Sequence, residues 1–278
     1  MEIQKFIKLA LEEDIQNGDF STLASIPEKA EGKAILKLKQ EGILAGLQWA
    51  KDIIHFVEPE AQFSVFMKDG DKINYGDIAF EVNAKVHTIL MTERLLLNTM
   101  QRMSGIATLT NKYVEKIKNY NTKILDTRKT TPLFRMHEKQ AVSIGGGHNH
   151  RFGLYDMIML KDNHIDFCGG IEKAILKTQQ YLKDKNLDLQ IEVETRNIED
   201  VKKVMATGGV DRIMLDNYSP DEIVDALKLI NHTIETEASG GINFENIESY
   251  ASTGVDYISV GALIHQAKSL DISLKAQI

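Results

Sequence analysis

The sequence predicts an α/β fold in which a small mixed domain precedes a parallel β-sheet that closes, or nearly closes, into a barrel. From Lys123 onward, short β-like apolar runs alternate with helix-length stretches, and such alternation implies a parallel sheet. Six such strands are visible, and a short seventh is expected near Arg151–Leu154. This number of strands suits a barrel better than an open sheet. Before Lys123 the pattern differs, because glycines punctuate short apolar runs that are flanked by stretches of helical periodicity.

The first 117 residues predict helices around a small α+β region. Residues 1–15 place apolar side chains three and four positions apart, which predicts an amphipathic helix that ends at Asn17-Gly18-Asp19. Between 34 and 82 the glycine-punctuated runs predict strands, with a helix at 47–57 and a hairpin at Asp69-Gly70-Asp71. Residues 86–117 return to helical spacing, and the simplest interpretation of the charges there is a solvated helix face.

The barrel elements follow in order. We predict strands at 123–126, 157–160, 189–194, 212–215, 233–238 and 257–260. We predict helices at 171–182, 198–206 and 221–230. The last stretch, 262–278, is expected to be helical. The resulting division is an N-terminal domain of residues 1–108, a barrel domain of residues 109–264, and a C-terminal helix, 265–278, that packs on the N-terminal domain.

Charge and composition narrow the class of function. The chain has a formal net charge of −7, yet residues 123–164 hold seven Lys and Arg against four Asp and Glu. A local basic pocket in an acidic protein favours a small polyanionic ligand over nucleic acid, which needs a broad positive face. The single cysteine, Cys168, excludes an internal disulfide. The chain shows neither a signal peptide nor an apolar run of membrane-spanning length, so we expect a cytoplasmic protein.

Polar, charged or glycine residues follow every one of the six predicted strands. In α/β barrels the loops after the carboxyl ends of the strands build the active site. We therefore expect these residues to lie together at one end of the barrel, which we call its mouth. In strand order they are Arg128 and Lys129, Lys161, Glu194, Asp216, Ser239-Gly240-Gly241, and Gly261.

The residue types at this mouth suit anion and metal chemistry. Arg128, Arg151 and Lys161 can pair with carboxylates or phosphates. Glu194 and Asp216 offer hard oxygen ligands for a Mg²⁺ that binds substrate phosphates, or they are ion-pair partners of the mouth cations.

The glycines and histidines near the mouth can be interpreted either as ligand-binding residues or as structural residues. Ser239-Gly240-Gly241 and Gly261-Ala262 precede predicted helices and can offer backbone N–H groups to phosphate, or they are simply turns. His148-Asn149-His150 lacks the spacing of a zinc site. We interpret His137 and His164 as structural or surface residues, and Cys168 as inert.

A set of motifs in a fixed order identifies a family that the chain resembles. The motifs are Ala10–Asp14 with Gly18-Asp19, Thr92-Glu93-Arg94, Gln101–Thr108, Asp126–Pro132, Gly145–Gly147, Asn149-His150-Arg151, Lys161–His164, Glu192–Glu194, Leu215–Asn217 and Ser239–Ile242. Together they cover nearly the whole chain and resemble the quinolinate phosphoribosyltransferases, also called nicotinate-nucleotide pyrophosphorylases (carboxylating).

The resemblance implies an N-terminal α/β sandwich domain and an incomplete, seven-stranded α/β barrel. It implies the joining of quinolinate to phosphoribosyl pyrophosphate with Mg²⁺, releasing pyrophosphate and CO₂ and forming nicotinate mononucleotide. It also implies homodimers with shared sites, sometimes assembled into hexamers, and no nucleic-acid or membrane partner.

The same resemblance assigns roles to residues at matching positions. Arg128, His150, Arg151 and Lys161 would hold the quinolinate carboxylates, Lys129 would line the site, and Arg102 would come from the neighbouring subunit. Glu194 and Asp216 would face the ribose and the metal-bound pyrophosphate, and Ser239, Gly240 and Gly261 would lie near the 5′-phosphate. Lys129, Lys161, Glu194 and Asp216 are the candidate catalytic residues.

Two departures and two alternatives remain open. Leu133 and Ala84 stand where the family often has glycine, which affects loop shape only.

A non-catalytic anion-binding or transport-accessory relative would bind ligand without turnover. A different barrel enzyme could use Lys161 to form a Schiff base with a carbonyl substrate.

Overall fold

The structure is a computed structural model that describes residues 3–277. The described residues form two compact units, and the chain passes between them more than once. The first unit takes in residues 3–111, 130–146 and 264–277, and the second takes in residues 112–129 and 147–263. Residues 130–146, which we expected in the barrel domain, therefore lie in the first unit. In residues 3–277 no helix combines the length and the apolar character that crossing a membrane requires.

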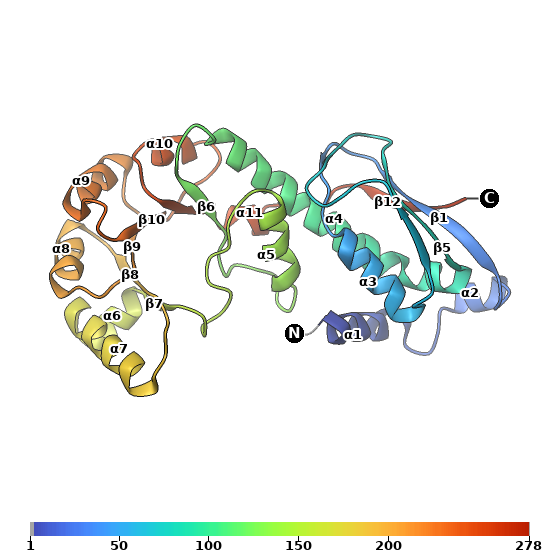
Figure 1. Cartoon of the computed structure of the whole chain (residues 1–278), viewed down its shortest axis with the longest axis horizontal. Coiled ribbons are helices and arrows are strands. Elements are labelled where there is room, and N and C mark those ends of the chain that lie inside the picture. The colour runs from blue at the N-terminus through green and yellow to red at the C-terminus, as the bar shows by residue number, and fades with distance from the viewer. Residues whose placement is uncertain (1–2, 278) are drawn as a thin grey trace. The chain divides into compact units, whose positions relative to one another are not determined.

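The first unit contains an antiparallel sheet with helices on one face (Figure 1). Its strands pair in the order β12-β1-β5-β3, and a separate small ladder joins β2 to β4. The strands are β1 Glu31–Leu38, β2 Gly42–Ile43, β3 Gln62–Val65, β4 Lys72–Ile73, β5 Ile78–Lys85 and β12 Ile272–Gln277. The helices are α1 Ile3–Ile15, α2 Phe20–Ser25, α3 Leu47–Val57, α4 Val86–Lys116, whose last turns enter the second unit, and α5 Arg135–Ile144.

Amphipathic spacing explains how this layer packs. Apolar side chains of α1, α3 and α4 meet the apolar face of the sheet, as Leu11, Ile53 and Met100 do against Leu36 and Val82 in one buried cluster. Predicted helices at 1–15, 47–57 and 86–117 are thereby confirmed within the described range.

Two predictions for this part of the chain are wrong. Asp69-Gly70-Asp71 does not join a hairpin, because β3 pairs with β5 while β4 pairs with β2. The turn instead contacts the segment that follows β2, because the Gly70 N–H donates to the Leu44 carbonyl (2.9 Å). The expected C-terminal helix is a short helix, α11 Ala262–His265, followed by strand β12. The alternating Ile272 and Leu274 side chains are buried against β1, which explains the strand.

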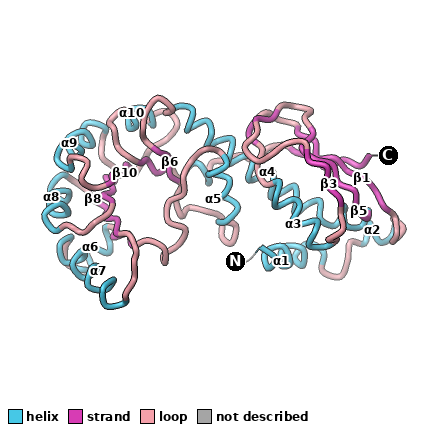
Figure 2. Tube along the Cα trace, viewed as in Figure 1, coloured by secondary structure: helices cyan, strands magenta, loops and turns pink. Residues whose placement is uncertain are grey.

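The second unit is built on a six-stranded parallel sheet, in the order β6-β11-β10-β9-β8-β7. Figure 2 shows that these strands form a curved sheet with helices on its outer side. The strands are β6 Lys123–Leu125, β7 Ile158–Leu160, β8 Ile191–Thr195, β9 Arg212–Asp216, β10 Glu235–Ser239 and β11 Tyr257–Ser259. The helices are α6 Asp162–Cys168, α7 Ile171–Lys185, α8 Ile198–Thr207, α9 Pro220–Ile230 and α10 Ile247–Ala251. All six predicted strands and all three predicted helices are present.

The expected seventh strand does not form. Among the described residues, Arg151–Leu154 carries no strand, and the sheet runs from β6 to β7 without closing. In its place a loop enters beside β6 through a single bridge between Leu125 and His148.

The strands of this sheet have two chemically different faces. Val193, Ile213 and Leu215 are fully buried and alternate with residues on the opposite face. Register places Glu192 beside Arg212 and Arg212 beside Glu235, so charged side chains share that opposite face. Figure 1 shows α7, α8 and α9 outside the curved sheet, and each of these helices has buried apolar side chains. The apolar face of the sheet therefore packs against the helices, and the charged face is the inner one.

Candidate functional site

The carboxyl ends of the parallel strands bring the predicted residues of the second unit to one end of the sheet. Asp216 and Ser239 are register partners at the ends of β9 and β10. Glu194, on the neighbouring β8, pairs in register with Met214, two residues before Asp216 on the same face. We call the following residues the strand-end site: Arg128, Lys129, Arg151, Lys161, Glu194, Asp216, Ser239, Gly240, Gly241 and Gly261.

Lys161 and Glu194 contact each other across β7 and β8. The Lys161 Nζ lies 3.5 Å from Glu194 Oε2, and the Asp162 N–H donates to Glu194 Oε1 at 3.4 Å. Glu194 is nearly buried, whereas the Lys161 side chain is 47% exposed. The expected ion pair between a mouth carboxylate and a mouth cation is present, and both partners keep capacity for a ligand because the contacts are long.

Arg128 and Arg151 lie on adjacent segments of the site, because Arg128 follows Asp126 by two residues and Asp126 accepts the N–H of His150, the chain neighbour of Arg151. Arg151 donates from Nη1 to the Met157 carbonyl (3.2 Å). Burial lowers the pKa of Arg151, and the positive charge of Arg128 lowers it further. Two neighbouring cations repel each other unless an anion lies between them, so this pair favours a ligand with more than one negative charge.

Lys129 and Gly261 complete the site without such close contacts. Lys129 is exposed, and its N–H donates to Thr127 Oγ1 (3.0 Å), which fixes the backbone after β6. Gly261 directly precedes α11.

The turn after β10 depends on glycine. Gly240 has φ +91°, and a Cβ there would lie 2.2 Å from Asn217 Oδ1. The Asn217 N–H donates to the Ser239 carbonyl (2.8 Å), so the turns after β9 and β10 pack closely. Gly241 has φ +63° and open space around it. One expectation fails here: residues 242–246 separate this turn from α10, so Gly241 does not begin a helix.

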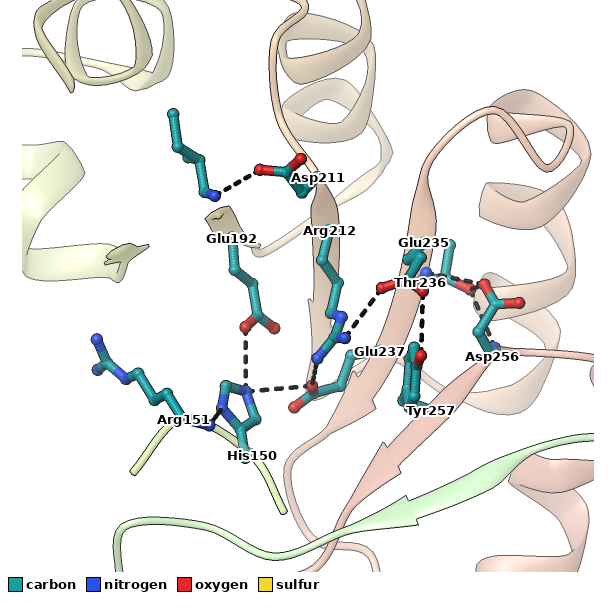
Figure 3. Close-up of polar contacts among 11 residues, drawn as sticks. His150, Arg151, Glu192, Asp211, Arg212, Glu235, Thr236, Glu237, Asp256 and Tyr257 are labelled. Carbon is teal, nitrogen blue, oxygen red and sulfur yellow. Dashed lines mark hydrogen bonds and ion pairs between the residues drawn. The ribbon is translucent and has the colours of Figure 1, made fainter. Parts of the chain in front are cut away.

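His150 belongs to a buried group that sequence reasoning did not assemble. Its Nε2 lies 3.0 Å from Glu192 Oε2 and 3.3 Å from Glu237 Oε2, and both carboxylates are fully buried (Figure 3). Arg212 donates to Glu237 (3.4 Å) and to Glu235 (2.9 Å). We call His150, Glu192, Arg212 and Glu237 the His150 cluster.

Hydrogen bonds and charges shift the protonation of this cluster. Burial lowers the pKa of His150, but hydrogen bonds and charges from Glu192 and Glu237 outweigh it and raise the pKa to about 9. Burial and the charge of Glu237 raise the pKa of Glu192. Burial raises the pKa of Glu237 too, but His150, Ser259 and Arg212 outweigh burial and hold it low. The cluster therefore keeps Glu237 ionised.

Arg102, in the first unit, is held by its own surroundings. Its Nε and Nη2 donate to Oε1 of the fully buried Glu138 (2.9 and 2.8 Å), and Nη1 and Nη2 donate to the Ala267 and Ile264 carbonyls (2.8 Å each). Counted over residues 3–277, four of its five N–H groups have a partner, which leaves one Nη1 hydrogen for a ligand. The interpretation of Arg102 as a solvated charge is wrong.

The residues expected to bind Mg²⁺ fit that ion chemically. Glu194 and Asp216 offer carboxylate oxygens, the ligands that Mg²⁺ prefers. Asp216 is half-buried, with Oδ2 accepting from Asn217 Nδ2 (2.6 Å), and Glu194 makes only long contacts. Both carboxylates therefore retain free lone pairs. His150, Glu192 and Glu237 also form a possible ligand group, but Arg212 and the raised His150 pKa already supply its positive charge.

Comparison with known proteins gives a consistent result over the whole chain. The family model for the quinolinate phosphoribosyl transferase C-terminal domain matches residues 106–275, and the model for the N-terminal domain matches residues 19–104. The chain is 45% identical to the chloroplastic nicotinate-nucleotide pyrophosphorylase [carboxylating] of Arabidopsis thaliana, covering 99% of this chain and 82% of the relative. It is 42% identical to the probable nicotinate-nucleotide pyrophosphorylase [carboxylating] of Bacillus subtilis, covering 99% and 93%.

Solved structures agree with these relatives. The crystal structure of NadC from Streptococcus pyogenes superposes with a TM-score of 0.93 at 40% identity, covering 99% of this chain and 97% of that one. A nicotinate-nucleotide pyrophosphorylase from Francisella tularensis superposes with a TM-score of 0.91 at 37% identity, covering 99% and 96%.

Proposed function

The chain belongs to the quinolinate phosphoribosyltransferase family, and on that premise we propose how its strand-end site performs the family's reaction. The protein is a decarboxylating phosphoribosyltransferase of NAD biosynthesis. It joins quinolinate to phosphoribosyl pyrophosphate and forms nicotinate mononucleotide, pyrophosphate and CO₂.

The observation that carries the assignment of roles is the placement of Arg128 and Arg151 on the two segments that the Asp126–His150 hydrogen bond joins. Quinolinate is a pyridine dicarboxylate, so its two negative charges match the two guanidinium groups. Lys161 adds a third cation at the same end of the sheet, held by Glu194 at 3.5 Å. Each charge-assisted hydrogen bond contributes about 1.5–3 kcal/mol, so the three together can bind the dianion and fix its ring.

The remaining residues of the site act on the phosphoribosyl donor. Glu194 and Asp216 would hold Mg²⁺ and the ribose hydroxyls, and their negative charge would stabilise the positive charge that develops on the ribose carbon. When bound, Mg²⁺ neutralises the charge of the leaving pyrophosphate. Backbone N–H groups of the open turn Ser239-Gly240-Gly241 and of Gly261 would face the 5′-phosphate.

Decarboxylation follows from the chemistry of the joined product. Once the ring nitrogen carries the ribose it is cationic, and it stabilises the electron pair that stays on the adjacent ring carbon when the carboxylate leaves as CO₂. That carbon then takes up a proton, which completes nicotinate mononucleotide. Lys129 and Lys161 would orient that carboxylate. The Lys161 amine is engaged with Glu194 at 3.5 Å, which disfavours the alternative of a Schiff-base nucleophile.

A turnover assay tests this function. Purified protein with quinolinate, phosphoribosyl pyrophosphate and Mg²⁺ should release nicotinate mononucleotide and CO₂, and a parallel reaction with nicotinate should be far slower. Chelation of the metal should stop turnover, and added Mg²⁺ should restore it. Folded protein that binds quinolinate without turnover would instead support a non-catalytic relative.

Replacement of Arg128 tests the carboxylate role. Arg128→Ala should raise the KM for quinolinate about 10-fold to 100-fold, and it should change the KM for phosphoribosyl pyrophosphate much less. Arg196→Ala is the matched control, because Arg196 is exposed in the same unit and pairs with Asp166. Equal losses for both substrates would contradict the role.

We also propose homodimers in which Arg102 serves the neighbouring subunit's site, because one Nη1 hydrogen remains for a ligand when residues 3–277 are considered. Arg102→Ala subunits mixed with Lys161→Ala subunits should then regain part of the activity. Verified mixed dimers without any rescue would argue that Arg102 acts within its own subunit. Light scattering would separate dimers from hexamers.

The proposed location is the cytoplasm, which suits a chain with one cysteine. The Bacillus subtilis relative carries no organelle in its name, whereas the Arabidopsis thaliana relative is named as chloroplastic. Cell fractionation with an antibody against the protein tests this location.

A further inference from the structure

The His150 cluster lies inside the curved sheet, where the proposed reaction assigns no role to Glu192, Arg212 or Glu237. The three side chains come from the neighbouring strands β8, β9 and β10 and meet on one face (Figure 3). Glu192 and Glu237 are fully buried, and Arg212 is 8% exposed. His150 is itself buried, with 8% of the residue exposed.

The backbone of His150 is fixed at the end of β6. Its N–H donates to Oδ1 of the fully buried Asp126 (2.9 Å). The Asp126 N–H donates to the His148 carbonyl (3.0 Å), and the His148 N–H donates to the Ile124 carbonyl (2.8 Å). This loop therefore enters the sheet at the place where a seventh strand was expected.

Both ring nitrogens of His150 are engaged. Nε2 faces the two carboxylates at 3.0 and 3.3 Å. Nδ1 accepts the backbone N–H of Arg151 at 2.6 Å. The carboxylates favour a proton on Nε2. Nδ1 can accept the Arg151 N–H only while it carries no proton, so the two contacts together belong to a ring with its single proton on Nε2.

Stability alone does not account for these charges. Two carboxylates, one guanidinium and one imidazole lie in the interior of the sheet, and apolar residues of similar volume are often equally stable or more stable in such positions. The His150 ring contacts the Arg151 N–H, Glu192 and Glu237, with Arg212 behind Glu237, while Asp126 holds the His150 backbone. These groups hold the His150 ring at both of its nitrogens, and His150 is the chain neighbour of Arg151, a residue of the strand-end site.

We propose that Glu192 and Glu237 are positioning residues: they hold the His150 ring through Nε2, and the ring holds the backbone of Arg151, whose guanidinium binds quinolinate. Arg212 keeps Glu237 turned toward the ring. This inference rests on the proposed function for the identity of the ligand, but the chain of contacts from Glu237 to Arg151 lies within the second unit alone.

Conservative substitutions test the chain of contacts. Glu192→Gln and Glu237→Gln keep the shape of the side chain and remove its charge. Each should raise the KM for quinolinate about tenfold or more, with the KM for phosphoribosyl pyrophosphate changed less than about threefold. Glu235→Gln is the matched control, because Glu235 shares Arg212 but has Tyr257 as its other partner. It should change both KM values less than about threefold.

A double-mutant cycle separates positioning from general damage. In a His150→Gln background, Glu237→Gln should add less than about a twofold further rise in the KM for quinolinate, because the ring through which it acts is gone. Independent, multiplied effects of the two changes would overturn the proposal. So would equal losses for both substrates.

A measurement of the His150 tautomer in the free protein does not depend on turnover. With ¹⁵N-labelled histidine, NMR at the pH of the assay should show the His150 proton on Nε2 and an unprotonated Nδ1. The Glu192→Gln and Glu237→Gln variants should lose this preference for a single tautomer. A wild-type ring with a proton on Nδ1 would overturn the proposal even if the variants failed to fold. Absent turnover in a protein whose His150 shows the expected tautomer would instead count against the proposed function.

Discussion

Protonation of His137 should destabilise the first unit as the pH falls from about 6.5 toward 4. His137, on α5, is fully buried against aromatic rings from three helices or their caps. Its ring centroid lies 3.8 Å from that of Trp49, 4.0 Å from Phe134 and 4.4 Å from Phe6. Neither ring nitrogen makes a hydrogen bond of ordinary geometry within residues 3–277. A charge on this ring would therefore be poorly solvated.

The size of the effect follows from the shift in pKa. Burial lowers the pKa of His137 from 6.5 to about 4, and the Phe134 backbone opposes this only in part. The unfolded chain takes up its proton near pH 6.5, while the folded chain resists protonation until about pH 4. The contribution to stability is therefore complete above pH 6.5 and is lost as the pH falls through about 4. A difference of this size corresponds to about 3 kcal/mol of unfolding free energy.

Trp49 offers a direct assay, because it is the chain's single tryptophan and lies against His137. Urea unfolding followed by its fluorescence should be measured from pH 7.5 to pH 4.5 for the wild type and for His137→Phe. The wild type should lose about 2–3 kcal/mol more than the variant over this range. His265→Gln, at an exposed position, is the matched control and should follow the wild type. Parallel curves for the wild type and His137→Phe would refute the reasoning.

Three further substitutions test local features of the first unit. Glu138→Gln removes the fully buried carboxylate that holds Arg102, and urea unfolding should show a loss of about 3 kcal/mol; a loss below about 1 kcal/mol would contradict the role of the pair. Leu133 has φ +64°, so Leu133→Gly should gain about 0.5–1 kcal/mol, whereas Leu133→Ala should gain nothing. If both variants changed the urea midpoint equally, backbone strain would not be the cause. A Cβ at Gly105 would lie 2.1 Å from the Lys268 carbonyl oxygen, so Gly105→Ala should lower Tm clearly, by the equivalent of about 2–4 kcal/mol; an unchanged Tm would show that the segment after α11 moves aside.

Local periodicity predicted the regular parts of the fold. The strand at 212–215 was predicted because a short apolar run lies between two helical stretches, and β9 Arg212–Asp216 confirms it. The C-terminal strand was missed because its partner, β1, lies far away along the chain. Residues 272–277 are too few for their spacing to separate a strand from the end of a helix, and only the distant partner decides between them.

The candidate site was predictable where it follows from strand direction. Parallel strands end at one edge, so Glu194, Asp216 and Ser239 were expected together, and the register places them there. Glu192 and Glu237 were missed as partners of His150, because the sequence does not say which loop enters the sheet. The alternation of charged and apolar residues in β8 and β10 was the available signal, since it indicates a sheet with a polar inner face.

The pairing of β12 with β1 has a consequence for the synthesis of the protein. β1 is complete at Leu38, but its register partner begins at Ile272. At about 5–20 residues per second, a ribosome needs roughly 10–50 s to make the intervening chain. During that time one edge of β1 has no strand to pair with, and an exposed strand edge is a template for association with other nascent chains. Substitutions that weaken the pairing of β12, Ile272–Gln277, with β1 should therefore reduce the yield of folded protein before they affect the activity of the folded enzyme.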